Sequence, residues 1–125
     1  MGFISMVGSL FGCSAQQNAD FKTVDVAEFE RVIAQPDVQR LDVRTADEYN
    51  DGHIAGAVNI DVLKDDFEPK AVSALSKDKP VALYCRSGNR SKKAAAILAA
   101  KGYDVIELAT GYNGWTRESR PVTTE

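Results

Sequence analysis

The part of this sequence best suited to chemistry is residues 85–91, where a cysteine is followed by two arginines and several small polar residues. The segment follows an apolar run at 81–84 and precedes an alanine-rich stretch of high helical propensity. At such a junction in a parallel sheet, ligands bind beside helix N–H groups that have no partner within the helix. Cys85 is therefore predicted to have a lowered pKa and to react as the thiolate.

The charges near Cys85 favour an anionic substrate. Residues 85–93 include Arg86, Arg90, Lys92 and Lys93 but no acid, a local charge of +4 in a chain whose net charge is −3. An isolated cysteine is more often an inert, buried small residue. The flanking arginines and Gly88 instead favour a thiolate that acts on, or carries, an anionic group.

Strand-like and helix-like segments alternate around this junction. Two capping boxes, Asp25 with Glu28 and Thr45 with Glu48, predict helices over about 26–34 and from 46 to Gly52. Such alternation predicts an α/β domain with a largely parallel sheet. The other predicted elements are strands at 38–43, 57–60, 81–84 and 105–108, a helical piece at 71–75 interrupted near Pro69, a helix at 91–101, and a turn-rich segment at 111–115 whose Trp115 packs onto the domain.

The composition limits the class of protein. A chain of 125 residues with 44% hydrophobic and 26% charged residues suits one globular domain, which we place at residues 20–125. The net charge of −3 argues against a general nucleic-acid binder. Two cysteines and one histidine do not form a disulfide framework, and no cluster has metal-ligand spacing. We expect a monomer that needs neither a metal nor a cofactor.

Residues 1–19 contain no charged side chain. Their apolar run, 3–11, is far shorter than the roughly 20 residues that span a bilayer but suits a secretory signal. The run leads into Leu-Phe-Gly-Cys at 10–13, which resembles a bacterial lipobox, so we favour a lipid anchor at Cys13 on the periplasmic side of a membrane. Since no Lys or Arg precedes the run, a disordered extension of a cytoplasmic protein stays open as the second interpretation.

Four segments, in order, resemble the signatures of the rhodanese-type sulfurtransferases. The loop at 85–91 resembles the active-site loop of that family. Leu-Asp-Val-Arg at 41–44 with Glu48 and Tyr49 resembles the first signature, and residues 52–60 resemble the second. Residues 102–105 and 111–115 resemble the C-terminal segments, although Thr110 stands where many members carry the first of two glycines. The resemblance covers about residues 22–122.

The resemblance implies a three-layer α/β fold, with a central, mostly parallel sheet of five strands between helices. It also implies sulfur relay: the Cys85 thiolate takes the outer sulfur of thiosulfate or a related donor, and the persulfide passes it to cyanide or another thiol. The loop backbone would cradle the persulfide sulfur, and both arginines would serve donor binding more than folding. The residues expected to bind substrate are Arg86, Ser87, Gly88, Asn89, Arg90 and Ser91.

Three further signature residues are expected to support the structure. Asp42 and Arg44 follow a strand and are predicted to pin loops through an ion pair. His53 lies in a segment that supports the sheet in the resembling family, so we favour a structural role over a cysteine–histidine dyad.

Two other functions stay open beside sulfur transfer. One is a non-catalytic protein-binding module, although members of that kind commonly lack the cysteine, which is present here. The other is a phosphatase or arsenate reductase. Phosphatases of this type place an arginine six positions after the cysteine, where this chain has Ser91.

Overall fold

The computed structural model describes residues 20–125. The predicted signal and the lipid anchor at Cys13 lie outside these residues. In the described part of the chain, no helix combines the length and the apolar character that crossing a membrane requires.

A parallel sheet of five strands forms the centre of the domain. The strands lie in the order β2 (Lys22–Val24), β6 (Val105–Leu108), β5 (Val81–Tyr84), β3 (Gln39–Asp42) and β4 (Val58–Asn59). Every neighbouring pair of strands is parallel. In register, Leu83 of β5 is paired with Leu41 of β3 on one side and with Glu107 of β6 on the other. The run at 81–84 therefore lies in the middle of the sheet, where a strand is buried on both faces and its residues are apolar.

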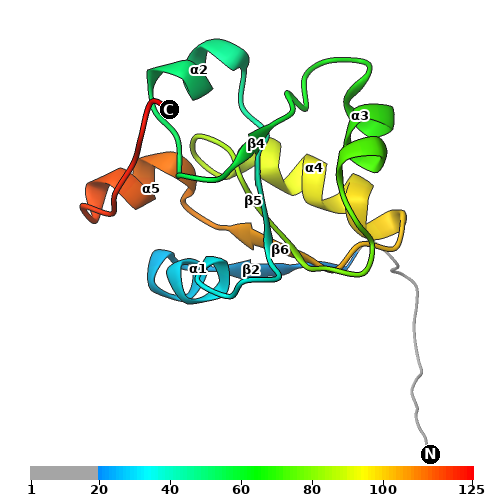
Figure 1. The fold of residues 1–125 in the computed structure, drawn as a ribbon, viewed down its shortest axis with the longest axis horizontal. Helices are drawn as coiled ribbons and strands as arrows, with labels where there is room; N and C mark the ends of the chain where they lie inside the picture. Colours follow the sequence, from blue (N-terminus) through cyan, green and yellow to red (C-terminus); the bar gives the residue numbers. More distant parts are fainter. Residues whose placement is uncertain (1–19) are drawn as a thin grey trace, which may run out of the picture.

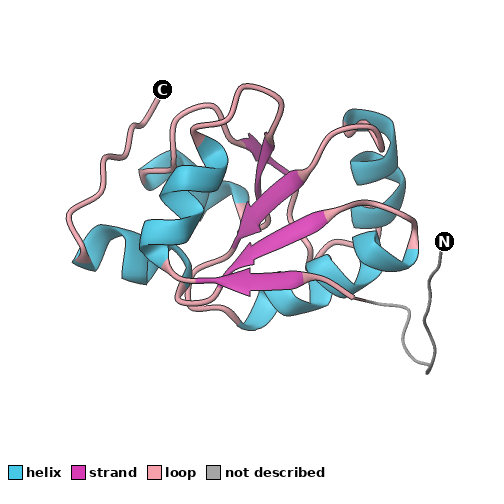
Figure 2. Cartoon of the chain, turned by 90° about the horizontal axis from the view of Figure 1, so that it is seen from below, coloured by secondary structure: helices cyan, strands magenta, loops and turns pink. Residues whose placement is uncertain are grey.

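Helices cover both faces of the sheet, which confirms the predicted α/β architecture (Figures 1 and 2). Buried residues of α3 (Phe67–Ala74) and α4 (Asn89–Ala100) pack on one face. Buried residues of α1 (Val26–Ile33) and α5 (Gly111–Arg117) pack on the other. The short α2 (Ala46–Asp51) follows β3, near the end of the sheet that carries residues 85–91 (Figure 1).

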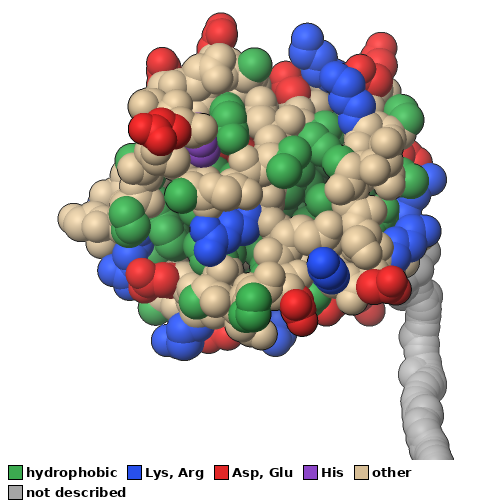
Figure 3. Space-filling model, viewed as in Figure 1, with side chains coloured by type: hydrophobic (Ala, Val, Ile, Leu, Met, Phe, Trp, Pro, Cys, Tyr) green, Lys and Arg blue, Asp and Glu red, His purple; other side chains and the backbone are tan. Residues whose placement is uncertain are grey.

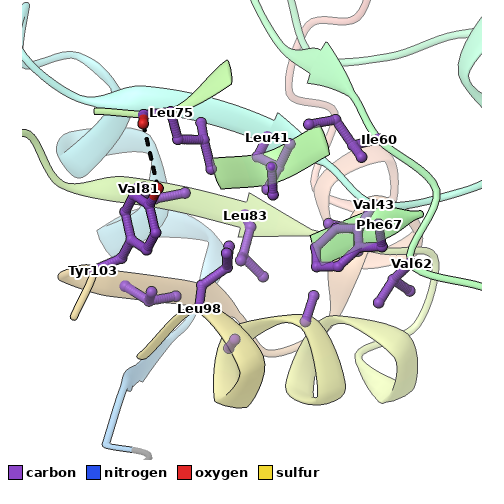
Figure 4. Packing of buried hydrophobic residues seen from close by; sticks show 14 of the residues in the cluster. Leu41, Val43, Ile60, Val62, Phe67, Leu75, Val81, Leu83, Leu98 and Tyr103 are labelled. Atoms are coloured by element: carbon purple, nitrogen blue, oxygen red, sulfur yellow. Dashed lines mark hydrogen bonds between the residues drawn. The ribbon is translucent and has the colours of Figure 1, made fainter. Parts of the chain in front are cut away.

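The side chains of β5 alternate between two hydrophobic clusters. Val81 and Leu83 point into the cluster beneath α3 and α4, whereas Ala82 and Tyr84 point into the cluster beneath α1 and α5. The period of two is that of a β-strand. Figure 4 shows the first cluster, in which the Tyr103 hydroxyl also donates to the Leu75 carbonyl. Cys85 continues the alternation and belongs to this first cluster.

Both predicted capping motifs lie at helix starts, although the one at Asp25 is only half of a capping box. The Asp25 carboxylate accepts the Glu28 backbone N–H at 2.9 Å, and α1 buries Val26, Phe29 and Ile33 at helical spacing. At α2, Thr45 and Glu48 each accept a backbone N–H of the other, a complete capping box. These contacts form within a single turn, which is why the sequence could indicate them.

Three local predictions were wrong. Residues 111–115 are helical, as the first part of α5, instead of turn-rich. Pro69 does not interrupt α3, because it lies in the first turn, where its missing N–H would have no partner within the helix. The short edge strand β2 was not predicted, and parallel pairing with β6 defines it.

The surface is charged and mixed in sign. On the face drawn in Figure 3, acidic and basic side chains are interspersed, and apolar side chains are visible in a hollow near its centre. Within residues 20–125, the large apolar side chains with the greatest exposure are Val58, Leu63, Val72 and Val122. Exposure of a few apolar residues is ordinary for a globular domain.

Candidate active site

Cys85 lies at the bottom of the loop that joins β5 to α4. Its side chain is 1% exposed, and its Sγ atom accepts the Gly88 backbone N–H at 3.1 Å. The loop runs between α2 and α5 at the carboxyl end of the sheet (Figure 1). The strand–helix junction predicted from the sequence thus positions the cysteine where ligands bind in open α/β sheets.

Hydrogen bonds around the sulfur favour its charged form. Burial by itself raises the pKa of the Cys85 thiol. The side chain and backbone of Ser91, together with the backbone N–H groups of Gly88 and Ser87, lower it by more, so the net shift is downward. The loop around Cys85 is therefore arranged to stabilise a negative charge on the sulfur.

Gly88 is required by the geometry of this loop. It is the N-cap of α4 and has a φ of 107°, in the region that favours glycine. A Cβ atom there would collide with the Ala109 carbonyl oxygen. Since Gly88 brings no capping side chain, the first N–H groups of α4 are left for the cysteine or a bound anion.

Helix α5 holds the loop from behind, a role that the sequence did not indicate. The backbone N–H groups of Tyr112 and Asn113 donate to the carbonyls of Cys85 and Arg86 at 2.8 and 2.9 Å. Gly111 allows this approach, because a Cβ atom there would lie 2.6 Å from the Arg86 carbonyl oxygen. Thr110 replaces the first glycine of the family's pair, but Gly111, the glycine that this close approach requires, is present and has a φ of 63°.

The two loop arginines have different surroundings. Arg90 forms a two-pronged ion pair with Glu48, at 2.8 and 3.0 Å, and only 22% of its side chain is exposed. Arg86 is 57% exposed and touches the same carboxylate at 3.4 Å. Arg90 therefore helps to hold α2 against the loop, a folding role that the sequence did not indicate, while the Arg86 guanidinium is more available to an anion.

The Glu48–Arg90 pair makes stability depend on pH. The Arg90 hydrogen bonds outweigh burial and hold the pKa of Glu48 at about 2, against an ordinary 4.5. Because the folded-state pKa is the lower one, the stabilisation is complete above 4.5 and is lost as the pH falls towards 2. We expect Glu48→Gln to lower the free energy of unfolding at pH 7 by about 1–3 kcal/mol, with a smaller loss at pH 3.5.

Urea denaturation of three variants tests this pair. Arg90→Ala should destabilise the protein at pH 7 about as much as Glu48→Gln, because either change leaves the other charge without its partner. The more exposed Arg86→Ala is the matched control and should cost less than about 0.5 kcal/mol. Equal losses in the two arginine variants would contradict the distinction drawn here.

Asp42 and Arg44 form a buried ion pair that ties three loops together. Arg44 Nη2 lies 2.6 Å from Asp42 Oδ2 and 2.7 Å from the Gly52 carbonyl oxygen, and both side chains are at most 1% exposed. The guanidinium carbon lies 4.1 Å from the centre of the Tyr112 ring, a cation–π distance. The pair thus connects the ends of β3 and α2 to the helix behind the active loop.

His53 is engaged within its own segment. Its ring stacks on Tyr49 with 3.7 Å between ring centres, and its Nδ1 lies 2.8 Å from the Tyr49 carbonyl oxygen. Its backbone exchanges two hydrogen bonds of 2.8 Å with Thr123, which fixes the C-terminal tail. None of these contacts involves the loop at 85–91.

The remaining loop residues that were predicted to bind substrate differ in their exposure to solvent. Ser87 and Asn89 are exposed on the outer side of the loop, whereas Ser91 is fully buried. The Ser91 hydroxyl donates to Glu107 Oε2 at 2.6 Å. Glu107, on β6, is a buried carboxylate beside the loop. From the sequence it was predicted only to lie in a strand.

Comparison with known proteins agrees with this geometry. The rhodanese-like domain family matches residues 25–118. A protein named sulfurtransferase from Allochromatium vinosum is 35% identical over 94 residues, covering 74% of this chain and 85% of the relative. Thiosulfate sulfurtransferase 18 of Arabidopsis thaliana is 33% identical over 124 residues, covering 90% of each chain.

A solved structure gives the same result for the fold. The crystal structure of a rhodanese-related protein from Thermoplasma volcanium superposes with a TM-score of 0.72 at 28% identity, over 84% of this chain and all of the other. The family match covers the sheet from β3 to β6, the cysteine loop and the whole of α5. This chain belongs to the rhodanese-like domain family.

Proposed function

We propose that this protein is a sulfurtransferase that moves sulfane sulfur from thiosulfate, or a related donor, to a thiophilic acceptor through a persulfide on Cys85. The observation that carries the proposal is the hydrogen bonding at Sγ, where a buried sulfur accepts the Gly88 N–H and the pKa of the thiol is lowered. The sulfurtransferase names of relatives at 33–35% identity support the same class of reaction.

In the first step, the Cys85 thiolate attacks the outer sulfur of thiosulfate. A bond forms between the two sulfur atoms, the sulfur–sulfur bond of the donor breaks, and sulfite leaves with the electron pair. The enzyme then carries a persulfide with one negative charge on its terminal sulfur. Since the thiolate is already favoured by its surroundings, the step needs no separate base.

The loop backbone supplies the stabilisation that the persulfide needs. The Gly88 N–H donates to the sulfur of Cys85 at 3.1 Å, and the backbone N–H groups of Ser87 and Ser91 also lower the pKa of the thiol. Donors arranged around one point form a cradle for negative charge without having to reorganise during the reaction. A terminal sulfur added to Cys85 enters this environment.

In the second step, an acceptor takes the terminal sulfur. Cyanide attacks that sulfur, the persulfide bond breaks, thiocyanate leaves, and the electron pair restores the Cys85 thiolate. A thiol acceptor follows the same course and becomes a persulfide. Electrons and charges balance in both steps with only the donor, the acceptor and the covalent persulfide, so the proposed cycle uses no cofactor.

Thiocyanate formation from thiosulfate and cyanide tests the proposal. The wild-type protein should show turnover that saturates with thiosulfate. Arg86→Ala should raise the KM for thiosulfate about tenfold, because the exposed guanidinium no longer attracts the dianion, with little change in the thermal midpoint. Arg31→Ala, whose side chain is 69% exposed on α1, is the matched control and should leave the KM unchanged.

The same preparation distinguishes the other functions. Release of phosphate from a phosphomonoester without thiocyanate formation would indicate a phosphatase. No turnover with thiosulfate or any other sulfane donor would favour a binding module. Either result would overturn the sulfurtransferase proposal.

A further inference from the structure

Glu107 places a negative charge in the interior directly beside the reactive loop. Its side chain is fully buried on β6, paired in register with Leu83, two residues before the nucleophile. Val105 and Cys85 belong to the same hydrophobic cluster, so the period of two puts Glu107 on the face of the sheet that carries the cysteine. A buried carboxylate is costly and needs partners.

Three side chains donate to this carboxylate. Thr23 of β2 donates to Oε1 at 2.8 Å, and Ser91 of α4 donates to Oε2 at 2.6 Å. The Lys92 ammonium also reaches Oε2, at 3.2 Å, while it donates to the Gly88 carbonyl at 3.1 Å. The Glu107 side chain is thus connected to the cysteine loop through two consecutive residues of α4.

Ser91 is shared between the carboxylate and the cysteine. Its side chain is fully buried, and its hydroxyl and backbone N–H lie close enough to the sulfur to lower the pKa of the Cys85 thiol. A serine hydroxyl has one proton to donate. When that proton is directed to Glu107, as at 2.6 Å, the sulfur loses the Ser91 hydroxyl as a donor.

The charges near Cys85 therefore oppose one another. Arg90 and Lys92 favour a thiolate, but Arg90 is paired with Glu48 and Lys92 is paired with Glu107. Lys92 is 53% exposed and lies partly in solvent, whereas Glu107 is completely buried. Solvent screens the cation more than the carboxylate, so the net effect of this pair at the cysteine is negative.

We propose that Glu107 is a positioning residue of the active site, which limits the stabilisation of the Cys85 thiolate by holding the Ser91 hydroxyl proton and by adding a buried negative charge. The effect of Glu107 on the thiolate does not depend on the proposed function; only its consequence for the rate of sulfur transfer rests on that function. A thiolate that is stabilised too strongly is a poorer nucleophile, and nucleophilicity is best when the pKa is near the ambient pH. Glu107 keeps the loop from over-stabilising the charge that the backbone donors favour.

The rate of alkylation of Cys85 by iodoacetamide, followed against pH in a full-length Cys13→Ser background, tests the inference. Glu107→Gln removes the charge but keeps an oxygen for Ser91 and Lys92, and its amide can donate to Thr23. The midpoint of the alkylation profile should fall by about one pH unit. Lys92→Met removes the opposite charge and should raise the midpoint by about half a unit.

Thr23→Val is the matched control, because it removes a hydrogen bond to Glu107 without changing any charge, and it should leave the midpoint unchanged. The inference is overturned by an unchanged or raised midpoint in Glu107→Gln, or by an equal fall in Thr23→Val. If Glu107→Gln does not fold, the double variant Glu107→Met with Lys92→Met, which removes both charges of the pair, decides: a lowered midpoint supports the inference, and an unchanged or raised one overturns it.

Alkylation of Cys85 does not require sulfur transfer, so a failure of the sulfurtransferase proposal can be distinguished from a failure of the role proposed for Glu107. A protein that forms no thiocyanate can still show the opposite shifts in Glu107→Gln and Lys92→Met. A protein that forms thiocyanate without these shifts would retain the proposed function and lose the role of Glu107.

Discussion

Wild-type protein incubated with thiosulfate should gain one sulfur atom, about 32 Da, whereas Cys85→Ser should gain none. The serine oxygen occupies the same buried position, but it is not a thiolate at neutral pH and cannot form the sulfur–sulfur bond. Thiocyanate formation should fall by about 10³-fold or more in the same variant. Intact-protein mass spectrometry and the turnover assay measure the two effects.

Cys13→Ser is the matched control, since Cys13 is the other cysteine of the chain. It should gain the sulfur and retain the wild-type rate. The persulfide assignment fails if Cys85→Ser still acquires the added mass, or if the mass is lost in Cys13→Ser instead. Similar thermal midpoints of Cys85→Ser and wild type would show that the loss is chemical.

The largest expected loss of stability follows from breaking the buried pair between Asp42 and Arg44. Arg44→Ala should lower the free energy of unfolding by about 3–5 kcal/mol, because it leaves the Asp42 carboxylate buried without its partner. It also removes the guanidinium that contacts the Gly52 carbonyl and the Tyr112 ring. For a domain whose total stability is of order 5–15 kcal/mol, this is a large fraction. Urea denaturation at pH 7 provides the measurement.

Arg31→Ala removes an arginine–carboxylate pair of the same 2.6 Å length on the exposed side of α1. It should leave the free energy of unfolding nearly unchanged, because solvent replaces the lost contact. A double variant, Asp42→Leu with Arg44→Met, should recover part of the Arg44→Ala loss by removing both buried charges. If Arg44→Ala costs no more than Arg31→Ala, the pair does not hold the loops as described.

The features that could be predicted from the sequence are those whose causes lie within a few residues. The helix caps at Asp25 and Thr45 form because each side chain accepts the backbone N–H three positions later. The apolar run at 81–84 indicated a central strand, and the glycine and cations after it indicated a loop suited to anions. Cys85 could therefore be identified as the candidate nucleophile without knowledge of its surroundings.

Local propensity was misleading where tertiary contacts oppose it. Gly111 and Gly114 lower helical propensity, yet α5 forms because burial of Trp115 and hydrogen bonds to the Cys85 and Arg86 carbonyls stabilise it. Strand β2 has little local signal, since two of its three residues are exposed, and it exists because β6 pairs with it. Both elements depend on segments more than 20 residues away in the chain.

The electrostatics of the site depend on contacts between residues that are far apart in the chain. The window at 85–93 carries four cations and no acid, which predicts a strongly positive pocket. Folding brings Glu48 to Arg90 from 42 positions away and to Arg86 from 38 positions away. It brings Glu107 to Lys92 from 15 positions away, so three of these four cations contact a carboxylate. Residue types and spacing therefore identify the reacting atom, whereas the charge around it depends on which distant carboxylates the sheet and helices bring within hydrogen-bonding distance.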